Sequence, residues 1–430
     1  MRSITDTLKR GSFLLFAAEA LNSAAGTLLT VGVLFYMTHR FGWTARENFA
    51  VAACQGMLYV LGALSARRLA DRWKRIAALQ TLYAVMPLLA LSAGFCATTG
   101  RAVPTALIVA VQTGMMGASW PLLESLVSAA GDQSQLSRRL GWYNIVWSVM
   151  GAVALALSGA IIQYLPPWAF FGIVAIVQIS AGAIITLRRF LRARLSAAEH
   201  AEQTVAPEAD AVNSEASLEE SKTVRLRLAL WLSRIALPST YVIIFSLSPA
   251  LPTLAAIERL SPTLATIQCS IWFVARAAAF IILINTVFWQ RRPVLTLIAG
   301  VTMLVGFLGT IIFGSLPGTG IGVGYGAALF LMGLTQVLLG LSLGTIYACS
   351  LYFGMAISKG STRHGGYHEA LIGLGQVLGP VVGVTAQLVR PNALWPVAVG
   401  ISLIVTATIV TGTVAGIRIA GGFRAMISGD

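Results

Sequence analysis

Charged residues are scarce in this chain. They make up 11% of the 430 residues, while apolar residues make up 57%. A soluble domain usually carries about 25% charged residues, so this composition excludes an ordinary water-soluble globular protein. In place of charge, the chain has about twelve apolar stretches, each long enough to cross a bilayer as a helix. We therefore predict an integral membrane protein.

The apolar stretches predict an all-α membrane protein of about twelve transmembrane helices in two pseudo-symmetric six-helix bundles. Strands are excluded, because the stretches are too long and lack turn signals at short intervals. A helix is also favoured because it satisfies its own backbone hydrogen bonds in lipid. The expected spans are 13–37, 47–66, 76–98, 104–129, 142–164, 168–187, 228–254, 264–289, 294–315, 322–352, 367–389 and 393–417.

Metal-ligating residues are also few. The four cysteines all lie within expected spans and none is close to another, which excludes a disulfide framework or a cysteine metal cluster. His364 and His368 are four residues apart beside Glu369, a spacing seen in metal sites. Gly365 and Gly366 interrupt that spacing and no further ligand is near in the sequence. We therefore expect no metal and no cofactor.

Acidic residues number 16 against 30 basic ones, and the basic residues are unevenly distributed. If the N-terminus is cytoplasmic, 23 of the 30 fall on the inner side, five on the outer side and two within spans. This asymmetry follows the positive-inside rule. It predicts a multi-pass protein of the plasma (cell inner) membrane with both termini in the cytoplasm. Because the net charge of +14 sits in short loops beside apolar helices, we expect no nucleic-acid partner.

One long polar segment, residues 188–227, separates six spans from the other six. It begins and ends with basic residues, is acidic and rich in Ala and Ser between them, and has too few large apolar residues for a core. We expect a partly disordered cytoplasmic connector between an N-terminal bundle (1–187) and a C-terminal bundle (228–430).

The two halves show a weak internal repeat. A segment with Tyr143 precedes the fifth span, and one with Tyr367, 224 residues later, precedes the eleventh. At the same separation Gly151 matches Gly375, and Gly159 matches Gly383. Two six-helix repeats with a site between them near the membrane midplane form a known transporter architecture.

The chain resembles the major facilitator superfamily over nearly its whole length. The resemblance rests on twelve spans in two halves, the long central loop, and the run Arg67–Arg75 between the second and third spans. That run, RRLADRWKR, is similar to the family signature G-x-L-A-D-R-x-G-R, with Arg67 and Lys74 replacing its two glycines. The resemblance implies that Asp71 closes a cytoplasmic gate together with Arg72, Arg75 and Arg139. The alternative is that the loop only supplies charge to the inner side.

The eleventh span carries a Gly-x-x-x-Gly-Pro-x-x-Gly pattern. Its members are Gly375, Gly379, Pro380 and Gly383. Small residues at this spacing let helices approach closely, and proline bends a helix. The pattern therefore predicts a packing or hinge role. In proton-coupled antiporters of the family a similar motif is typical of the fifth span, where this chain has Leu155 and Ala156 instead.

Ionisable residues inside the spans are the best candidates for a site, because a charge in the bilayer costs about 2.5–3.5 kcal/mol unless it faces a cavity or a partner. Those chosen for a substrate or coupling site are Glu19, Asn22, Glu124, Arg234 and Arg276. The resemblance implies that spans 1, 4, 7 and 10 line a central cavity, with spans 2, 5, 8 and 11 contributing.

The arginines among these residues are expected to bind an anionic group of the substrate, and Glu19 or Glu124 to carry a proton. The alternative is a structural ion pair of Arg234 with Glu19 or Glu124. Glu369, at the start of the eleventh span, is expected to favour the helix N-terminus.

The expected function is secondary transport of a small solute by alternating access, with proton coupling and a monomer in the bilayer. No nucleotide-binding signature is present, so we expect the energy to come from a gradient or from the substrate itself. One alternative is a transporter-like sensor or scaffold that moves no solute, which a cavity plugged by bulky side chains would favour. A membrane-embedded enzyme is disfavoured, because residues 188–227 are too short and polar to form a catalytic domain. We therefore predict no enzymatic activity.

Overall fold

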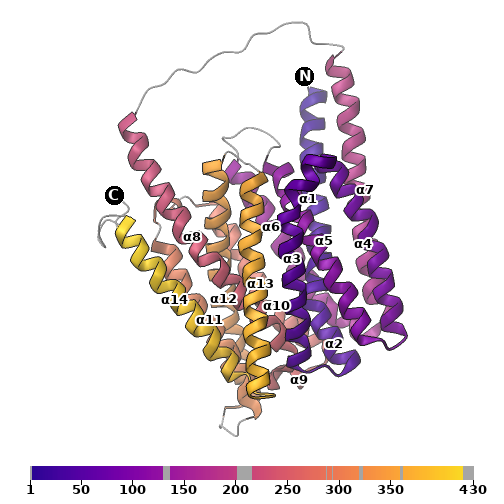
Figure 1. Ribbon diagram of the computed structural model, residues 1–430, viewed down its shortest axis with the longest axis vertical. Helices are drawn as coiled ribbons and strands as arrows, with labels where there is room; N and C mark the ends of the chain where they lie inside the picture. The colour runs from indigo at the N-terminus through magenta and orange to yellow at the C-terminus, as the bar shows by residue number, and fades with distance from the viewer. Residues whose placement is uncertain are drawn as a thin grey trace.

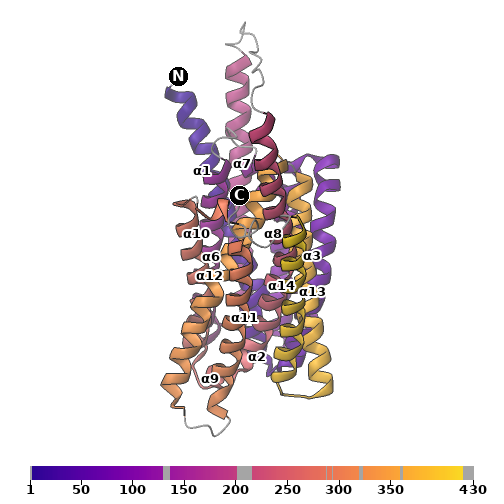
Figure 2. The same ribbon diagram turned by 90° about the vertical axis from the view of Figure 1, so that its left-hand side faces the viewer.

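The protein is a bundle of long helices, seen here in a computed structural model (Figures 1 and 2). The residues described are 2–128, 136–200, 216–286, 288–292, 294–318, 323–358 and 362–419. Twelve helices in this part of the chain are long and apolar enough to cross a membrane. Their number and order are those predicted from the sequence.

The first six spans are formed by α1 to α7. Their bounds are α1 Arg2–Thr27, the π-helix η1 Leu28–Gly32, α2 Val33–Phe41, α3 Ala45–Trp73, α4 Arg75–Thr98, α5 Ala102–Ser128, α6 Leu136–Tyr164 and α7 Pro167–His200. Since α1, η1 and α2 follow one another without interruption, they form a single span.

The last six spans are formed by α8 to α14. Their bounds are α8 Ala216–Ala250, the 3-10 turn η3 Leu251–Thr253, α9 Ala255–Glu258, α10 Pro262–Ile284, η4 Phe288–Arg291, α11 Val294–Ser315, η5 Leu316–Gly318, α12 Tyr325–Ser358, α13 Thr362–Val389 and α14 Trp395–Ile419.

The helix ends follow local sequence signals. Thr44 and Glu47 form a reciprocal capping box at the start of α3, where the Glu47 carboxylate accepts a bond of 2.8 Å from the Thr44 backbone N–H. Ser261 caps α10 directly before Pro262. Gly42, with φ of 69°, ends α2 in the left-handed conformation. These caps set the turns on one side of the bundle.

Figure 1 shows that α7 ends and α8 begins on the same side of the bundle, which we call the linker side. Helix α1 begins and α14 ends on that side as well. The turns between α2 and α3 and between α4 and α5 lie on the opposite side. Successive spans therefore cross the bundle in alternating directions.

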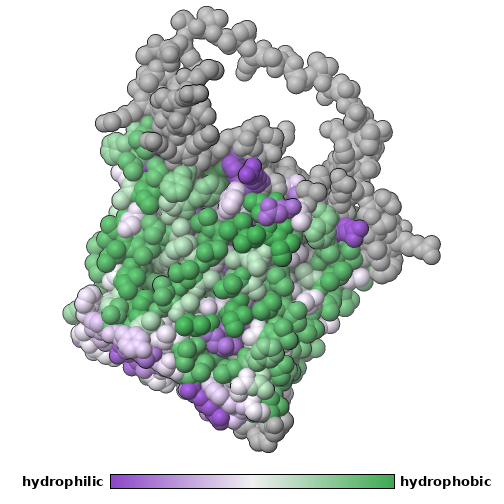
Figure 3. Space-filling view, turned by 180° about the vertical axis from the view of Figure 1, so that it is seen from behind, coloured by the Kyte–Doolittle hydropathy of each residue, from purple (hydrophilic) through white to green (hydrophobic). Residues whose placement is uncertain are grey.

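The outer surface matches a membrane setting. A broad hydrophobic band covers the face shown in Figure 3, with hydrophilic residues gathered at its edges. Burial then separates central from peripheral spans. The first and seventh spans are 78% and 72% buried inside the protein, whereas Trp395–Arg418 is only 28% buried and therefore peripheral.

Two long helix pairs join the first six spans to the last six: α3 with α13, and α6 with α10. Both depend on glycine for close approach. A Cβ at Gly56 would lie 2.6 Å from the backbone carbon of Gln376, and one at Gly159 would lie 2.5 Å from that of Pro262. On the side opposite the linker, α2 also packs on η3, and Asn48 donates to the Pro249 carbonyl at 3.5 Å.

Three boundaries differ from the expectations. Helix α7 continues to His200 and α8 begins at Ala216, so helix extends into both ends of the expected connector, whose middle lies outside the described residues. The expected loop Arg67–Arg75 is helical up to Trp73, with only Lys74 outside a helix. The eighth span ends at Ile284, five residues early, because Asn285 turns the chain out of the helix.

Candidate functional site

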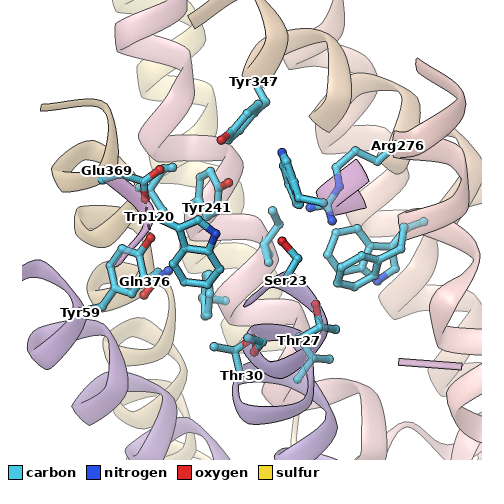
Figure 4. Close-up of a pocket in the computed structure, with 18 of the residues that line it drawn as sticks. Ser23, Thr27, Thr30, Tyr59, Trp120, Tyr241, Arg276, Tyr347, Glu369 and Gln376 are labelled. Carbon is cyan, nitrogen blue, oxygen red and sulfur yellow. Dashed lines mark hydrogen bonds between the residues drawn. The ribbon is translucent and has the colours of Figure 1, made fainter. Parts of the chain in front are cut away.

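The central feature of the bundle is a cavity with about 90 Å³ of open space (Figure 4). Spans 1, 2, 4, 5, 7, 8, 10 and 11 each contribute to its wall, the set implied by the resemblance noted above. Its polar and aromatic lining includes Ser23, Thr27, Tyr59, Trp120, Tyr143, Trp147, Tyr241, Phe245, Trp272, Phe273, Arg276, Tyr347, Glu369 and Gln376. The wall is mainly aromatic, with a few polar groups at its edges.

Arg276 supplies the positive charge in this wall. It comes from α10, is 3% exposed, and its guanidinium carbon lies 4.1 Å from the ring centroid of Trp147 and 4.4 Å from that of Phe273. Its Nε donates to the Ser148 hydroxyl at 3.1 Å, while Nη2 has no hydrogen-bond partner. Among the described residues no carboxylate forms an ion pair with it. Aromatic faces hold this cation in place but do not neutralise it.

Glu19 lies directly behind the cavity wall. Its Oε1 accepts hydrogen bonds from Ser23 at 2.6 Å and from the Trp120 indole at 3.2 Å, and both of these residues line the cavity. Its Oε2 is buried without a hydrogen-bond partner. Burial of this kind favours the uncharged form of a carboxyl group. Glu19 therefore lies next to the cavity wall, as the sequence analysis expected. Ser23 and Trp120 separate it from the open space.

A second group of polar residues lies toward the linker side. Glu124 of α5 approaches His368 and Glu369 of α13, and one ligand-type atom of each lies within 4.8 Å of the others. The Tyr59 hydroxyl donates to Glu369, which the close-up shows across the cavity from Arg276 (Figure 4). Because α13 begins at Thr362, Glu369 is two turns inside the helix and 2% exposed. The expectation that it serves the helix N-terminus is therefore wrong.

Asn22 is buried but does not line the cavity. Its side-chain oxygen accepts from Ser119 of α5 at 3.3 Å, so it joins the first and fourth spans. Glu19 and Asn22 both contact residues of α5, Trp120 and Ser119 respectively.

Arg234 is not part of the central cavity, contrary to expectation. It lies in a separate groove of about 1610 Å³ among α3, α8 and α13, otherwise lined by side chains such as Met57, Trp231 and Leu374. The described residues include no ion pair of Arg234 with Glu19 or Glu124. Two turns of α8, with Pro238 between them, separate Arg234 from Tyr241 in the cavity wall. The same face of α8 therefore lines the cavity at Tyr241 and the groove at Arg234.

The residues expected to form a gate are not gathered in one place. Asp71 is 71% exposed and pairs with Arg67 of its own helix at 3.6 Å. Arg75 and Arg139 donate to carbonyls in the last turn of α5, at 3.3 Å to Ser125 and 3.1 Å to Ser128. There they complement the negative end of the helix dipole. Arg72 is exposed.

The glycine pattern of the eleventh span packs on two neighbours. A Cβ at Gly375 or Gly379 would lie 2.5 Å from the carbonyl oxygen of Pro238 or Val242 in α8. Gly383 faces the ring of Phe49 in α3. Pro380 lies within α13, which continues to Val389. These are helix-packing positions.

Sequence reasoning missed several lining residues. Among them, Tyr59, Trp272 and Phe273 received no particular weight. An aromatic residue in a span gives no sequence signal of whether it faces lipid or a cavity, since both settings are apolar. Only the polar tip of Tyr59, inside a predicted span, offered a hint.

Comparisons with known proteins agree with this architecture. The sequence model of the Major Facilitator Superfamily matches residues 15–380. Among solved structures, the chain is similar to a bacterial homolog of the human lysosomal transporter Spinster, in an inward-facing and unoccupied conformation. That likeness has a TM-score of 0.58 and 14% identity, and covers 96% of each chain. At that identity it supports the fold alone. No curated protein matches the chain.

Proposed function

The chain belongs to the Major Facilitator Superfamily, and from that premise we propose that this membrane transporter carries a small organic anion with an aromatic or apolar body. Arg276 is the observation behind this proposal. A guanidinium buried in the membrane without a carboxylate is costly, and an anionic group entering the cavity relieves that cost. The aromatic wall fits the remainder of such a solute.

The conformation supports transport by alternating access. On the side opposite the linker, α2 packs on η3 and Asn48 bonds to the Pro249 carbonyl, so the first and last six spans meet beyond the cavity. Separation of these contacts would open the cavity toward the side opposite the linker. The positive-inside distribution supports a plasma-membrane protein with the linker side and both termini in the cytoplasm.

Glu19 is the residue we assign to proton coupling. It contacts two cavity-lining residues, Ser23 and Trp120, yet is itself fully buried. A proton on Glu19 removes a negative charge from the protein interior, and loss of that proton restores the charge. Because a buried charge is costly, protonation of Glu19 lowers the free energy of conformations in which the cavity is closed. This links a proton gradient to the conformation of the first six spans.

Transport by the purified protein in liposomes tests the proposal. Uptake of labelled aromatic carboxylates, beginning with benzoate and hydroxybenzoates, is expected to saturate and to rise when the lumen is made alkaline. Arg276→Gln is expected to weaken anion affinity by roughly 100-fold, the loss typical of a removed partner in a buried charge pair. Arg234→Gln is the matched control, because it removes an intramembrane arginine from the lateral groove only.

The same liposomes test coupling separately from binding. Glu19→Gln is expected to abolish accumulation driven by the proton gradient while leaving exchange of labelled for unlabelled anion in place. Normal gradient-driven accumulation by this variant would remove Glu19 as the coupling residue. Equal affinities of the wild type and Arg276→Gln for every anion tested would remove the proposed substrate class.

The non-transporting alternative loses its main support. A sensor or scaffold with a transporter fold was expected to have a cavity plugged by bulky side chains. The cavity instead keeps about 90 Å³ of open space, although nine of its lining residues are aromatic. We keep transport as the proposed function and take absence of flux for all solutes as the result that would restore the alternative.

A further inference from the structure

The group formed by Glu124, His368 and Glu369 has no part in the mechanism proposed above. It joins α5 of the first six spans to α13 of the last six, near the linker-side end of the cavity. All three side chains are buried, with exposures of 0%, 6% and 2%. Two carboxyl groups and an imidazole this close together are costly to bury. When ionised, the carboxylates repel each other, and lone pairs without a hydrogen bond lose their contact with water.

The group's own atoms are incompletely satisfied. Among the described residues, neither carboxyl oxygen of Glu124 nor the Nε2 atom of His368 has a hydrogen-bond partner, although all three atoms are buried. These three atoms come from two helices, α5 and α13, and their residues meet at one point. Buried polar atoms in a folded protein are normally paired, so this many unpaired atoms in one place point to a missing ligand.

The outer contacts orient the group as in a metal site. Ser350 lies 3.2 Å from His368 Nδ1, which leaves Nε2 as the nitrogen available for a ligand. Tyr59 donates to one oxygen of Glu369. Hydrogen bonds to the outer atoms of a ligating histidine and carboxylate are the usual second set of contacts around a protein-bound metal.

We propose that Glu124, His368 and Glu369 bind a divalent transition-metal ion between the two sets of six spans. Imidazole nitrogen together with carboxylate oxygens suits Mn²⁺, Fe²⁺, Co²⁺ or Zn²⁺, whereas Mg²⁺ and Ca²⁺ prefer oxygen ligands alone. A charge of +2 neutralises two carboxylates. Three protein ligands leave at least one coordination position open.

Only folding brings the three ligands together. The sequence analysis expected no metal site, because no further ligand lies near His368 and Glu369 in the sequence. His368 and Glu369 have no third ligand near them in the sequence, but Glu124, more than 240 residues earlier, reaches them through the packing of α5 on α13. Because the ligands come from both sets of spans, a bound ion ties the linker-side ends of α5 and α13 together. Bound metal therefore opposes separation of these helices during transport.

Direct binding of Mn²⁺ to the full-length, chelator-treated protein in detergent tests the proposal without any transport. Titration with free Mn²⁺ followed by electron paramagnetic resonance is expected to show one bound ion per chain. Glu124→Gln and His368→Ala are each expected to weaken binding at least about 10-fold. His39→Ala is the matched control, because that histidine lies in the last turn of α2 on the opposite side. Mg²⁺ at the same concentration is expected not to displace Mn²⁺.

A third variant separates loss of a ligand from loss of fold. Glu369→Gln keeps an oxygen that accepts from Tyr59 while removing the charge, and it too is expected to weaken Mn²⁺ binding with an unchanged elution volume in size exclusion. Absence of Mn²⁺ binding to the wild type, or binding equal in all four variants, would overturn the proposal and leave protons as the only cations for this group. Arg276→Gln is expected to bind Mn²⁺ like the wild type, so failure of the anion proposal and failure of this one give different results.

Discussion

Two helix pairs join the same two sets of spans, yet they differ in the charge that they carry. The pair α3–α13, which we call the carboxylate interface, brings Tyr59 to Glu369. The pair α6–α10, the arginine interface, brings Ser148 to Arg276. Figure 4 shows Tyr59 and Glu369 on one side of the cavity and Arg276 on the other. The two interfaces thus place a carboxyl group and a guanidinium on opposite walls.

The two interfaces are alike in their backbone packing. Gly159 faces Thr266 at the start of α10, and Gly383 faces Phe49 at the start of α3, in the two places that the 224-residue repeat relates. From Phe49 to Thr266 is 217 residues, and from Tyr59 to Arg276 is also 217. Arg276 therefore occupies the position in the eighth span that Tyr59 occupies in the second.

The difference teaches that packing and chemistry are set by separate positions. Glycine positions determine how closely the helices approach, and they recur in both interfaces. Ten residues after Phe49 in α3 is Tyr59, and ten residues after Thr266 in α10 is Arg276. These two residues decide whether the cavity wall presents a phenol or a guanidinium. A substitution at one kind of position tests the shared packing, and one at the other kind tests the contrast in charge.

The largest effect is expected from the glycines. Gly56→Leu and Gly159→Leu place side chains against the backbones of Gln376 and Pro262, and each is expected to lower the free energy of unfolding by about 1–3 kcal/mol or more, because two backbones must separate. Thermal unfolding followed by tryptophan fluorescence measures this loss. Gly326→Leu is the control, since nothing lies within 4 Å of that exposed glycine. Equal unfolding temperatures for all three variants would show that the interfaces are not tightly packed in the membrane protein.

The next largest effect is expected at the carboxylate interface. Tyr59→Phe removes the hydroxyl that donates to Glu369 and is expected to weaken Mn²⁺ binding about 10-fold, the lower end for an outer contact of a metal ligand. The Mn²⁺ titration described above measures the change. A loss of anion affinity larger than the loss of metal affinity would contradict the separation of the two interfaces.

A smaller effect is expected at the arginine interface. Ser148→Ala removes the hydroxyl that accepts from Arg276 Nε, and it is expected to weaken anion affinity about fivefold, as for one hydrogen bond worth about 1 kcal/mol. Competition with labelled anion in liposomes measures the affinity. Binding of Mn²⁺ should be unchanged, since Ser148 lies away from Glu124, His368 and Glu369; a matching loss there would show that the two walls act as one unit.

The smallest effect is expected outside both interfaces. Asp71→Asn breaks an exposed pair with Arg67 and is expected to change the free energy of unfolding by less than about 0.5 kcal/mol. Thermal unfolding with and without 0.5 M salt checks this, because salt already screens an exposed pair. A large destabilisation would mean that Asp71 has a buried partner, as the gate expectation requires.

The fold was largely predictable, because hydropathy acts within each span. The twelve spans lie within a few residues of their predicted bounds, apart from the longer ends of α3 and the early end of α10. Positions of single charges were harder to predict. Arg276 and Glu19 lie at the cavity as expected, but Arg234 faces a groove, since the direction of a side chain depends on the tilt and bend of α8 about Pro238.

The amino-acid sequence alone determined that the chain spans a membrane twelve times as helices, because each stretch must bury its own backbone polar groups in lipid regardless of the others. It also determined which costly charges lie within those spans. Only the tertiary structure decided which charges meet. Glu124, His368 and Glu369 come together, and Arg276 has no carboxylate partner within the described ranges. Contacts between distant helices depend on how glycine-lined faces pack and on the direction in which each helix turns its side chains.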